Sequence, residues 1–328
     1  MKVQNVLVTG GTGFLGRHLL AALAARGISA TVPTRRYERA KHLLPLPTVE
    51  VLEADVFAPG VLERLAAGKQ LVVNLVGILH SRRGRRDERG PNDYGPDFAR
   101  VHVELPQAIV GACRSAGARR LLHVSALGVA PDAPSEYLRS KAIGEQAVLA
   151  AEDLAVTVFR PSVMFGAEDR FLNRFAALAR ALPVLAVPCP RAEFQPVYVG
   201  DVVNAMLASI NDPETHGKAY ELAGPHVYAL RDLVRYVCAV TGRRRLVVGL
   251  PERLAMLQAF AFEMLPGEPL MSRDNVRSMR VANTTRTPFP FGLQPQALEA
   301  IAPFYLSPAS ARLTPRDRYP QLRLRSRR

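Results

Sequence analysis

Tyr137 and Lys141 lie four residues apart in the stretch Tyr-Leu-Arg-Ser-Lys. Positions four apart share one face of a helix, so the two side chains are expected to lie close together. A phenol has an ordinary pKa of about 10, and a neighbouring ammonium stabilises the phenolate and lowers that value. The pair therefore predicts a tyrosine that exchanges protons with a substrate while the lysine tunes its pKa; the alternative is an ordinary surface pair.

A glycine-rich loop precedes this pair by more than a hundred residues. Gly10, Gly13 and Gly16 follow an apolar run over Val3–Thr9 and open an apolar-patterned segment over 13–26. Such glycines allow a tight turn and a close backbone approach to a pyrophosphate, which the amide groups of the following helix then bind. The pattern predicts a dinucleotide site at Gly10, Thr12, Gly13, Phe14, Leu15 and Gly16; the alternative is a strand-to-helix turn without a ligand.

Two arginines stand about 20 residues after the loop, where NAD-specific proteins place an acid on the ribose hydroxyls. The sequence there reads Pro33-Thr34-Arg35-Arg36, without an acid. A guanidinium offers a fixed fork of donors to a phosphate, which suits the ribose 2′-phosphate of NADP(H). Arg35 and Arg36 therefore predict NADP(H) over NAD(H), unless they merely face solvent.

The elements that position these residues alternate along the first half of the chain. Apolar runs predict strands over 3–9, 29–32, 49–52, 71–76, 120–125 and 156–160, and helical patterns predict helices over 13–26, 103–116 and 137–152. Strands alternating with helices indicate an α/β fold of the Rossmann type, a doubly wound parallel sheet. A smaller C-terminal α/β region on the substrate side is expected beside it.

The domain organisation follows from where this alternation stops. We expect a dinucleotide-binding domain over 1–165, completed by roughly 194–212, with Asp201 capping a helix that runs to about Ile210. The smaller substrate-side region takes 166–193 and 213–305, and 306–328 is a basic tail expected to be flexible. The apolar segment over 250–265 predicts a core-facing or interfacial helix, because it is too short to span a membrane.

Composition limits the partners. The 328 residues carry a net charge of +14, from arginines clustered at 82–89, at 243–245 and in the tail, which favours an anionic partner or simply a basic surface. The lack of tryptophan and of aromatics interleaved with these arginines weighs against nucleic acid. Three distant cysteines and scattered histidines predict neither a disulfide framework nor a metal site. We expect a cytoplasmic protein, with contact to the inner face of the membrane or to a respiratory complex through the tail as an option.

A set of motifs carries a resemblance to a known family. From Val6 to about Asp201 the sequence resembles the short-chain dehydrogenase/reductase superfamily in its extended, epimerase/dehydratase-like branch. Within that branch it is most similar to the group of the complex I accessory subunit nine and its bacterial relatives. The motifs are the glycine loop, Glu53-Ala54-Asp55-Val56, Asn74-Leu75-Val76-Gly77, Val124-Ser125-Ala126-Leu127-Gly128, the Tyr137/Lys141 pair, Phe159-Arg160-Pro161-Ser162 and Gln195-Pro196-Val197-Tyr198-Val199-Gly200-Asp201.

This resemblance implies roles by position. Asp55 and Val56 would contact the adenine, and Leu75, Val76 and Gly77 would line the adenosine ribose and phosphates. Pro161, Ser162 and Val163 would border the nicotinamide, and Lys141 would also hold its ribose. Tyr137 and Lys141 would be the catalytic pair, with Ser125 as a third member.

Leu127 departs from the pattern of the family. Extended-branch enzymes usually carry a serine or threonine three places beyond the fifth strand, and counting from Val124 that place is Leu127. A leucine cannot hydrogen-bond a substrate carbonyl, so either Ser125 substitutes for it or that catalytic member is missing. The resemblance thus leaves three readings: an NADP(H)-dependent oxidoreductase with an unidentified small-molecule substrate, a cofactor-bound accessory protein of respiratory or quinone metabolism, and a nucleotide-sugar epimerase or dehydratase.

Overall fold

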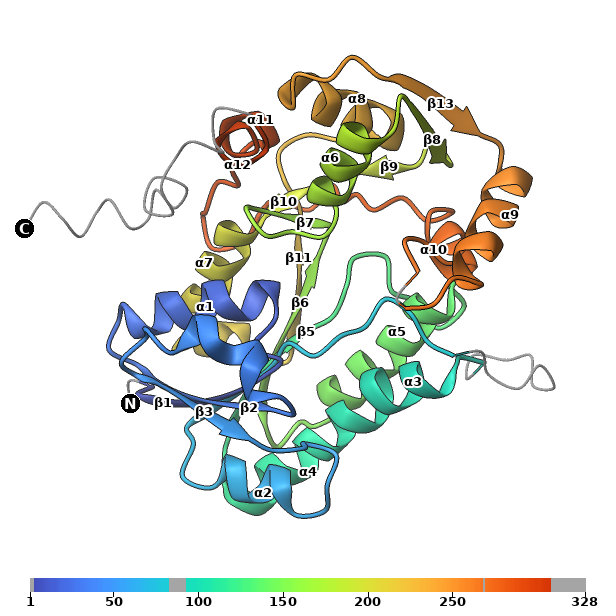
Figure 1. Cartoon of the computed structure of the whole chain (residues 1–328). Helices are drawn as coiled ribbons and strands as arrows, with labels where there is room; N and C mark the ends of the chain where they lie inside the picture. Colours follow the sequence, from blue (N-terminus) through green and yellow to red (C-terminus); the bar gives the residue numbers. More distant parts are fainter. Residues whose placement is uncertain (1–2, 83–92, 268, 308–328) are drawn as a thin grey trace, which may run out of the picture. The chain divides into compact units, whose positions relative to one another are not determined.

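A seven-stranded parallel sheet forms the centre of the first half of the chain (Figure 1). The computed structural model describes residues 3–82, 93–267 and 269–307. The strand order is β11-β6-β5-β4-β1-β2-β3, and every neighbouring pair is parallel. The strands are β1 (Asn5–Thr9), β2 (Ser29–Thr34), β3 (Val49–Glu53), β4 (Leu71–Asn74), β5 (Arg120–Val124), β6 (Ala155–Pro161) and β11 (Lys218–Leu222).

The order of the strands reverses next to β1. The chain runs outward through β1, β2 and β3, and then returns to place β4 on the other side of β1. Ligands of doubly wound sheets bind at such a switch point, beyond the carboxyl ends of the strands. The predicted α/β fold of Rossmann type is therefore confirmed, and its glycine loop follows β1 at this point.

Helices cover both faces of this sheet (Figure 1). Helix α1 (Phe14–Ala24) packs Leu15, Leu19, Leu20 and Leu23 inward on one face. On the other face α2 (Val61–Ala66), α4 (Leu105–Ala116) and α5 (Glu136–Leu149) enclose an aliphatic core with the strands. Short helical segments complete this part: η1 (Tyr37–Leu43), α3 (Pro96–Phe98), η2 (Ala99–Glu104), α7 (Val199–Ser209) and η3 (Pro213–Thr215).

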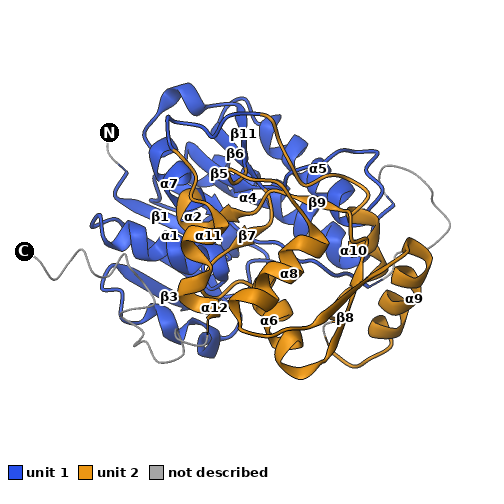
Figure 2. Cartoon of the chain, turned by 90° about the horizontal axis from the view of Figure 1, so that it is seen from above, with its two compact units in different colours: residues 1–161, 202–222, 287–293 blue, residues 162–201, 223–286, 294–328 orange. Residues whose placement is uncertain are grey.

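The chain divides into two compact units, coloured separately in Figure 2. Unit 1 comprises 1–161, 202–222 and 287–293, and unit 2 comprises 162–201, 223–286 and 294–328. Unit 2 holds three two-stranded sheets: β7 (Met164–Phe165) with β10 (Val197–Tyr198), β9 (Glu193–Phe194) with β12 (Tyr228–Ala229), and β8 (Val184–Pro188) with β13 (Leu246–Leu250). Its helices are α6 (Leu172–Ala181), α8 (Leu230–Val240), α9 (Glu252–Glu263), α10 (Arg273–Ser278), α11 (Leu298–Ile301) and α12 (Pro303–Leu306).

Two expectations about this half of the chain differ from the structure. Asp201 does not cap α7, because the helix already begins at Val199; its carboxylate accepts the amide of Gln296 at 2.7 Å instead. The compact units divide at 161/162 and assign 202–222 to unit 1, whereas the sequence suggested 194–212. Within 3–82, 93–267 and 269–307, no helix combines the length and apolarity needed to cross a membrane.

Candidate functional site

The glycine loop joins β1 to α1 in a turn that other residues would obstruct. Gly10 has a φ of +75°, and a Cβ on it would lie 2.9 Å from the backbone of Leu75 and Val76. Gly13 is the residue before α1, and a Cβ on Gly16 would overlap the carbonyl of Gly11. The loop therefore lies directly against the segment after β4, and no side-chain hydrogen bond from the N-cap residue Gly13 caps the amino end of α1. A helix amino end of this kind fits a diphosphate, because its amides and its dipole favour negative charge.

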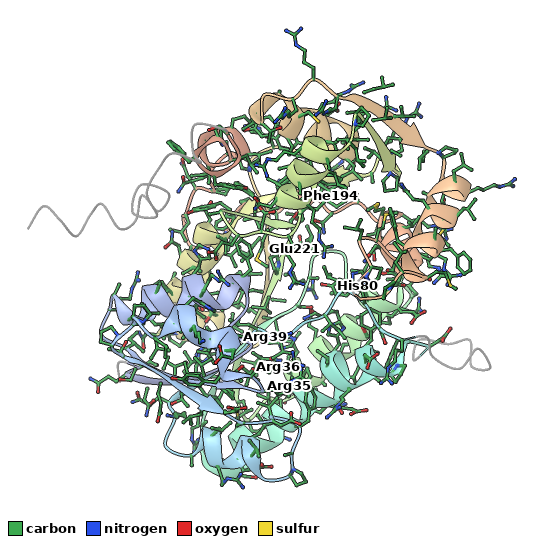
Figure 3. The ribbon with its side chains drawn as sticks, viewed as in Figure 1. Arg35, Arg36, Arg39, His80, Phe194 and Glu221 are labelled. Carbon is green, nitrogen blue, oxygen red and sulfur yellow. The ribbon has the colours of Figure 1, made fainter. Side chains whose placement is uncertain are left out.

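Arginines gather just beyond the end of β2. Arg35 and Arg36 are exposed, and the Thr34 hydroxyl fixes their backbone by accepting the Arg36 amide at 3.3 Å. Arg39, one turn into η1, is also exposed, and Figure 3 shows the three arginines together. Sequence reasoning missed Arg39, although its spacing of three and four residues from the other two was visible. Three guanidiniums here can meet a dianionic phosphate.

The segments after β3 and β4 form the other edge of this region. Asp55 opens a turn in which its carboxylate accepts the amide of Phe57 at 3.2 Å, and Val56 is half-buried. The amide of Leu75 donates to Thr9 at 3.0 Å, which continues the sheet beyond β4 and holds 75–77 beside the glycine loop. Both segments lie at the carboxyl edge of the sheet, where the resemblance implied adenosine contacts.

A row of buried polar side chains crosses the central strands. Asn74 accepts the Thr9 hydroxyl at 3.0 Å and the amide of Val76 at 3.2 Å, so its side-chain amide donates to Nδ1 of His123 at 3.1 Å. That contact places the imidazole proton on Nε2, which has no hydrogen-bond partner among the described residues. Burial lowers the pKa of His123 to about 3, and the Lys141 charge adds to this, so the ring is neutral.

A second buried histidine joins the loop after β4 to helix α5. His102 accepts the amide of Ile78 at Nε2 (3.1 Å) and lies 2.9 Å from the Ser140 hydroxyl at Nδ1. Because that hydroxyl donates to the Tyr137 carbonyl at 3.0 Å, His102 Nδ1 carries the proton. Burial holds the pKa of His102 well below its usual value. The sequence showed only a lone histidine here.

Tyr137 and Lys141 lie on α5 as predicted, but their electrostatics differ from the expectation. The Tyr137 ring meets the His102 ring edge-on at 5.5 Å, and burial raises the pKa of Tyr137 to about 12. Lys141 Nζ donates to the Val124 carbonyl at 2.8 Å. Burial lowers the pKa of Lys141 to about 8, an effect that the Glu145 carboxylate partly opposes. The expected lowering of the tyrosine pKa is therefore wrong for this state, because desolvation of the phenolate dominates.

Leu127, the residue that departs from the family pattern, lies in the loop after β5. It is buried and its amide donates to the Pro161 carbonyl at 3.0 Å, so a hydrocarbon side chain is buried at this position. Ser125 is also buried, and its amide donates to the Phe159 carbonyl at 2.7 Å. No partner for the Ser125 hydroxyl occurs among the described residues. That hydroxyl therefore retains an unused hydrogen-bonding capacity.

The residues expected at the nicotinamide are divided between the units. Pro161 ends β6 in unit 1, whereas Ser162 and Val163 open unit 2. There Asn283 Oδ1 accepts the Ser162 hydroxyl at 2.6 Å and the Val163 amide at 2.8 Å.

Part of the basic segment at 82–89 can be placed. Arg82 forms a two-pronged ion pair with Asp97, through Nε (3.0 Å) and Nη2 (2.9 Å). Arg83, Arg85, Arg86 and Arg89, and the tail from 308 onward, lie outside the described residues.

Comparison with known proteins places the chain in a family. The model of the NAD dependent epimerase/dehydratase family matches residues 6–223. The mouse mitochondrial NADH dehydrogenase [ubiquinone] 1 alpha subcomplex subunit 9 is 33% identical over 312 residues, which cover 91% of this chain and 79% of that protein. The ceramide reductase of Caulobacter vibrioides is 32% identical over 247 residues, covering 75% of this chain and 74% of the relative.

The fold has solved counterparts as well. The UDP-glucuronic acid 4-epimerase of Bacillus cereus, solved with UDP-glucuronic acid and NAD, superimposes with a TM-score of 0.63. The match covers 84% of this chain and 91% of the epimerase at 16% identity, a level that speaks for the shared fold alone. The family model spans the glycine loop, the Tyr137/Lys141 pair and the seven strands of the sheet apart from Asn5, the first residue of β1. This chain therefore belongs to the NAD dependent epimerase/dehydratase family.

Proposed function

We propose that the protein is an NADP(H)-binding oxidoreductase that reduces a carbonyl group of a small-molecule substrate. The observation that carries the cofactor preference is the exposed group Arg35, Arg36 and Arg39 beyond β2, because the two positions directly after the strand hold Arg35 and Arg36 rather than an acid that would receive ribose hydroxyls. A carboxylate there would repel a 2′-phosphate, whereas guanidiniums bind it with charge-assisted hydrogen bonds.

The residues of unit 1 have separable tasks in this proposal. The amide groups at the start of α1 bind the diphosphate, and Gly10 and Gly13 leave room for it. Lys141 anchors the ribose next to the nicotinamide, and Tyr137 donates its proton to the substrate oxygen as that oxygen gains charge. The nicotinamide supplies the hydride when it is bound. A Tyr137 pKa of about 12 keeps the phenol protonated at neutral pH, so the side chain carries the proton that reduction requires.

A second candidate is a cofactor-bound accessory protein of respiratory or quinone metabolism. Leu127 favours it, since a buried leucine cannot polarise a substrate carbonyl. Among the relatives, the complex I subunit points to this candidate and the ceramide reductase points to the first. A nucleotide-sugar epimerase is the third reading, and no residue of the described chain favours it over the other two.

The dissociation constants of NADPH and NADH test the proposed preference. Arg35→Ala and Arg36→Ala should each weaken NADPH binding about tenfold and leave NADH within about twofold, because only the 2′-phosphate contact is lost. Arg26→Ala, just after the carboxyl end of α1 and also exposed, is the charge-matched control and should change neither constant. Tighter binding of NADH than of NADPH by the unaltered protein would refute the preference.

The same preparations separate the two leading candidates. A carbonyl-dependent oxidation of NADPH that Tyr137→Phe abolishes, with the NADPH dissociation constant unchanged, supports the reductase. Retention of bound NADPH without oxidation across a range of ketones, aldehydes and quinones supports the accessory protein.

A further inference from the structure

Helix α9 turns its large apolar side chains toward solvent. It packs on unit 2 through two alanines, Ala255 and Ala259, which meet Val276 of α10 in a small buried cluster. The opposite side, the outer face of α9, carries large apolar residues, first at spacings of three and four and then at the adjacent Leu265 past the end of the helix. Each is between 42% and 72% exposed: Leu254, Leu257, Phe260, Met264 and Leu265. A surface helix normally buries an apolar stripe of this kind against the core. An apolar stripe that stays exposed is typical of an interaction surface.

Charged residues of both signs lie beside this outer face. Both carboxylates of α9 already have arginine partners: Glu252 pairs with Arg280, and Glu263 with Arg273 at 2.7 Å. The Arg273 guanidinium also stacks 5.0 Å above the Phe260 ring at the edge of the stripe. Arg253 adds a third, exposed guanidinium in the first turn. The charges within each of the two ion pairs neutralise each other, so the described part of α9 combines exposed hydrocarbon with the exposed guanidinium of Arg253.

The net charge of the whole chain indicates which kind of partner would cover the outer face of α9. A second copy would bring another +14 charge to the contact, which opposes self-association. Residues 308–328 contain seven arginines and a single acid, Asp317. A strongly basic protein with an exposed apolar helix face is attracted to the anionic headgroups of a lipid bilayer, while the apolar side chains enter the boundary below the headgroups.

We propose that the outer face of α9 docks on an anionic membrane surface, with the helix lying in the plane of the interface. Leu257, Phe260 and Met264 enter the boundary between headgroups and acyl chains, and Arg253 contacts a lipid phosphate. Unit 2, which carries α9 (Figure 2), is then the membrane-facing part of the protein. The proposal is independent of whether the protein is a reductase or an accessory protein.

The absence of tryptophan from the sequence allows a direct test on the full chain. Leu257→Trp places a single fluorophore on the outer face, and Leu44→Trp places one at a similarly exposed site in unit 1. With vesicles of phosphatidylcholine and phosphatidylglycerol, the emission of Leu257→Trp should shift to the blue and be quenched by brominated acyl chains. The emission of Leu44→Trp should not change.

Introducing negative charge on the outer face of α9 gives the complementary measurement. Leu257→Glu combined with Met264→Glu should lower the fraction that sediments with these vesicles about tenfold or more, because two charged groups replace inserted hydrocarbon. Leu44→Glu should sediment like the unaltered protein, and unchanged NADPH binding by all variants shows that they are folded.

Three results would overturn the proposal. One is an unshifted Leu257→Trp emission in the presence of vesicles. Another is equal binding to pure phosphatidylcholine vesicles, since the arginines would then contribute nothing. The third is a dimer that Leu257→Glu dissociates without any vesicle binding, which would assign this face to a second copy.

Discussion

The ammonium group of Lys141 lies in a buried environment that disfavours its positive charge. The side chain is buried, it donates to the Val124 carbonyl at 2.8 Å, and its pKa falls to about 8. Keeping this ammonium charged at neutral pH costs stability, and residues retained at such a cost commonly serve function. The folded form therefore releases a proton more easily than the unfolded chain does.

The stability of Lys141→Met measures this cost. At pH 7 the variant should gain on the order of 1–2 kcal/mol in its free energy of unfolding, after allowing for the lost hydrogen bond, and should bind NADPH more weakly. The lysine penalty is fully present below pH 8 and disappears as pH rises toward its unfolded value of about 10.5, so the gain should shrink over that interval. Urea unfolding at pH 7 and pH 10 tests both statements; a variant less stable at pH 7 would contradict the first.

At this scale the sequence predicted the helix that carries Tyr137 and Lys141, but not the protonation behaviour of either residue. The four-residue spacing placed Tyr137 and Lys141 on α5 correctly, because spacing on a helix is a local property. The pKa of Tyr137 depends on burial by other segments, and the tasks of His102 and Asn74 depend on strand register. Neither can be obtained from a single stretch of sequence.

Among the elements, η2 and α5 approach each other unusually closely. Residues Ala99–Glu104 form a π-helical turn before α4, and a Cβ on Gly144 would overlap the His102 carbonyl of that turn. Wide turns of this kind often occur at functional sites. Here the turn carries His102 to Ser140, so the packing of two helices fixes how α5 presents Tyr137.

Two glycine-to-alanine substitutions separate this contact from helix propensity. Gly144→Ala should destabilise the protein by roughly 1–3 kcal/mol, because the methyl group forces α5 away from η2. Gly111→Ala, on α4 with open space around it, should stabilise it by about 0.5–1 kcal/mol. Urea unfolding of both variants is the measurement, and equal effects of the same sign would contradict the close contact.

The sequence predicted the strands correctly where burial gives them a continuous apolar pattern. The six expected strands agree with the structure to within two residues at each end, since central strands of a parallel sheet are continuous apolar runs. Strand β11 was missed because it pairs on one side only, with β6, and its residues are mostly half-exposed. The π-helical turn was also missed, because it continues an ordinary helical pattern.

For the molecule as a whole, buried histidines predict sensitivity to acid. Burial lowers the pKa of His18 to about 4 and of His123 to about 3, and it lowers that of His102 further below normal. The unfolded chain takes up these protons near pH 6.5 and the folded chain does not, so stability falls as pH drops below about 6.5. Asp169 and Asp201, whose pKa values are raised by burial, offset part of this loss.

The loss should amount to roughly 2 kcal/mol per buried histidine at pH 5. His123→Asn should therefore lose about 2 kcal/mol less than the unaltered protein between pH 7.5 and pH 5, whatever its stability at pH 7.5. His226→Asn, at an exposed position, is the control. Identical acid sensitivity of His123→Asn and the parent would show that His123 is not the titrating group.

The interrupted path of the chain through unit 1 has a consequence for biosynthesis. Strand β11 completes the sheet beside β6, yet its residues leave the ribosome some sixty positions after β6 ends. Until then the nascent sheet presents the β6 backbone as an unpaired edge, which is a template for pairing with other chains. Any fragment that ends before Lys218 keeps this edge open, so a shortened chain that stops at Pro161 is expected to aggregate although it contains the complete glycine loop and the Tyr137/Lys141 pair.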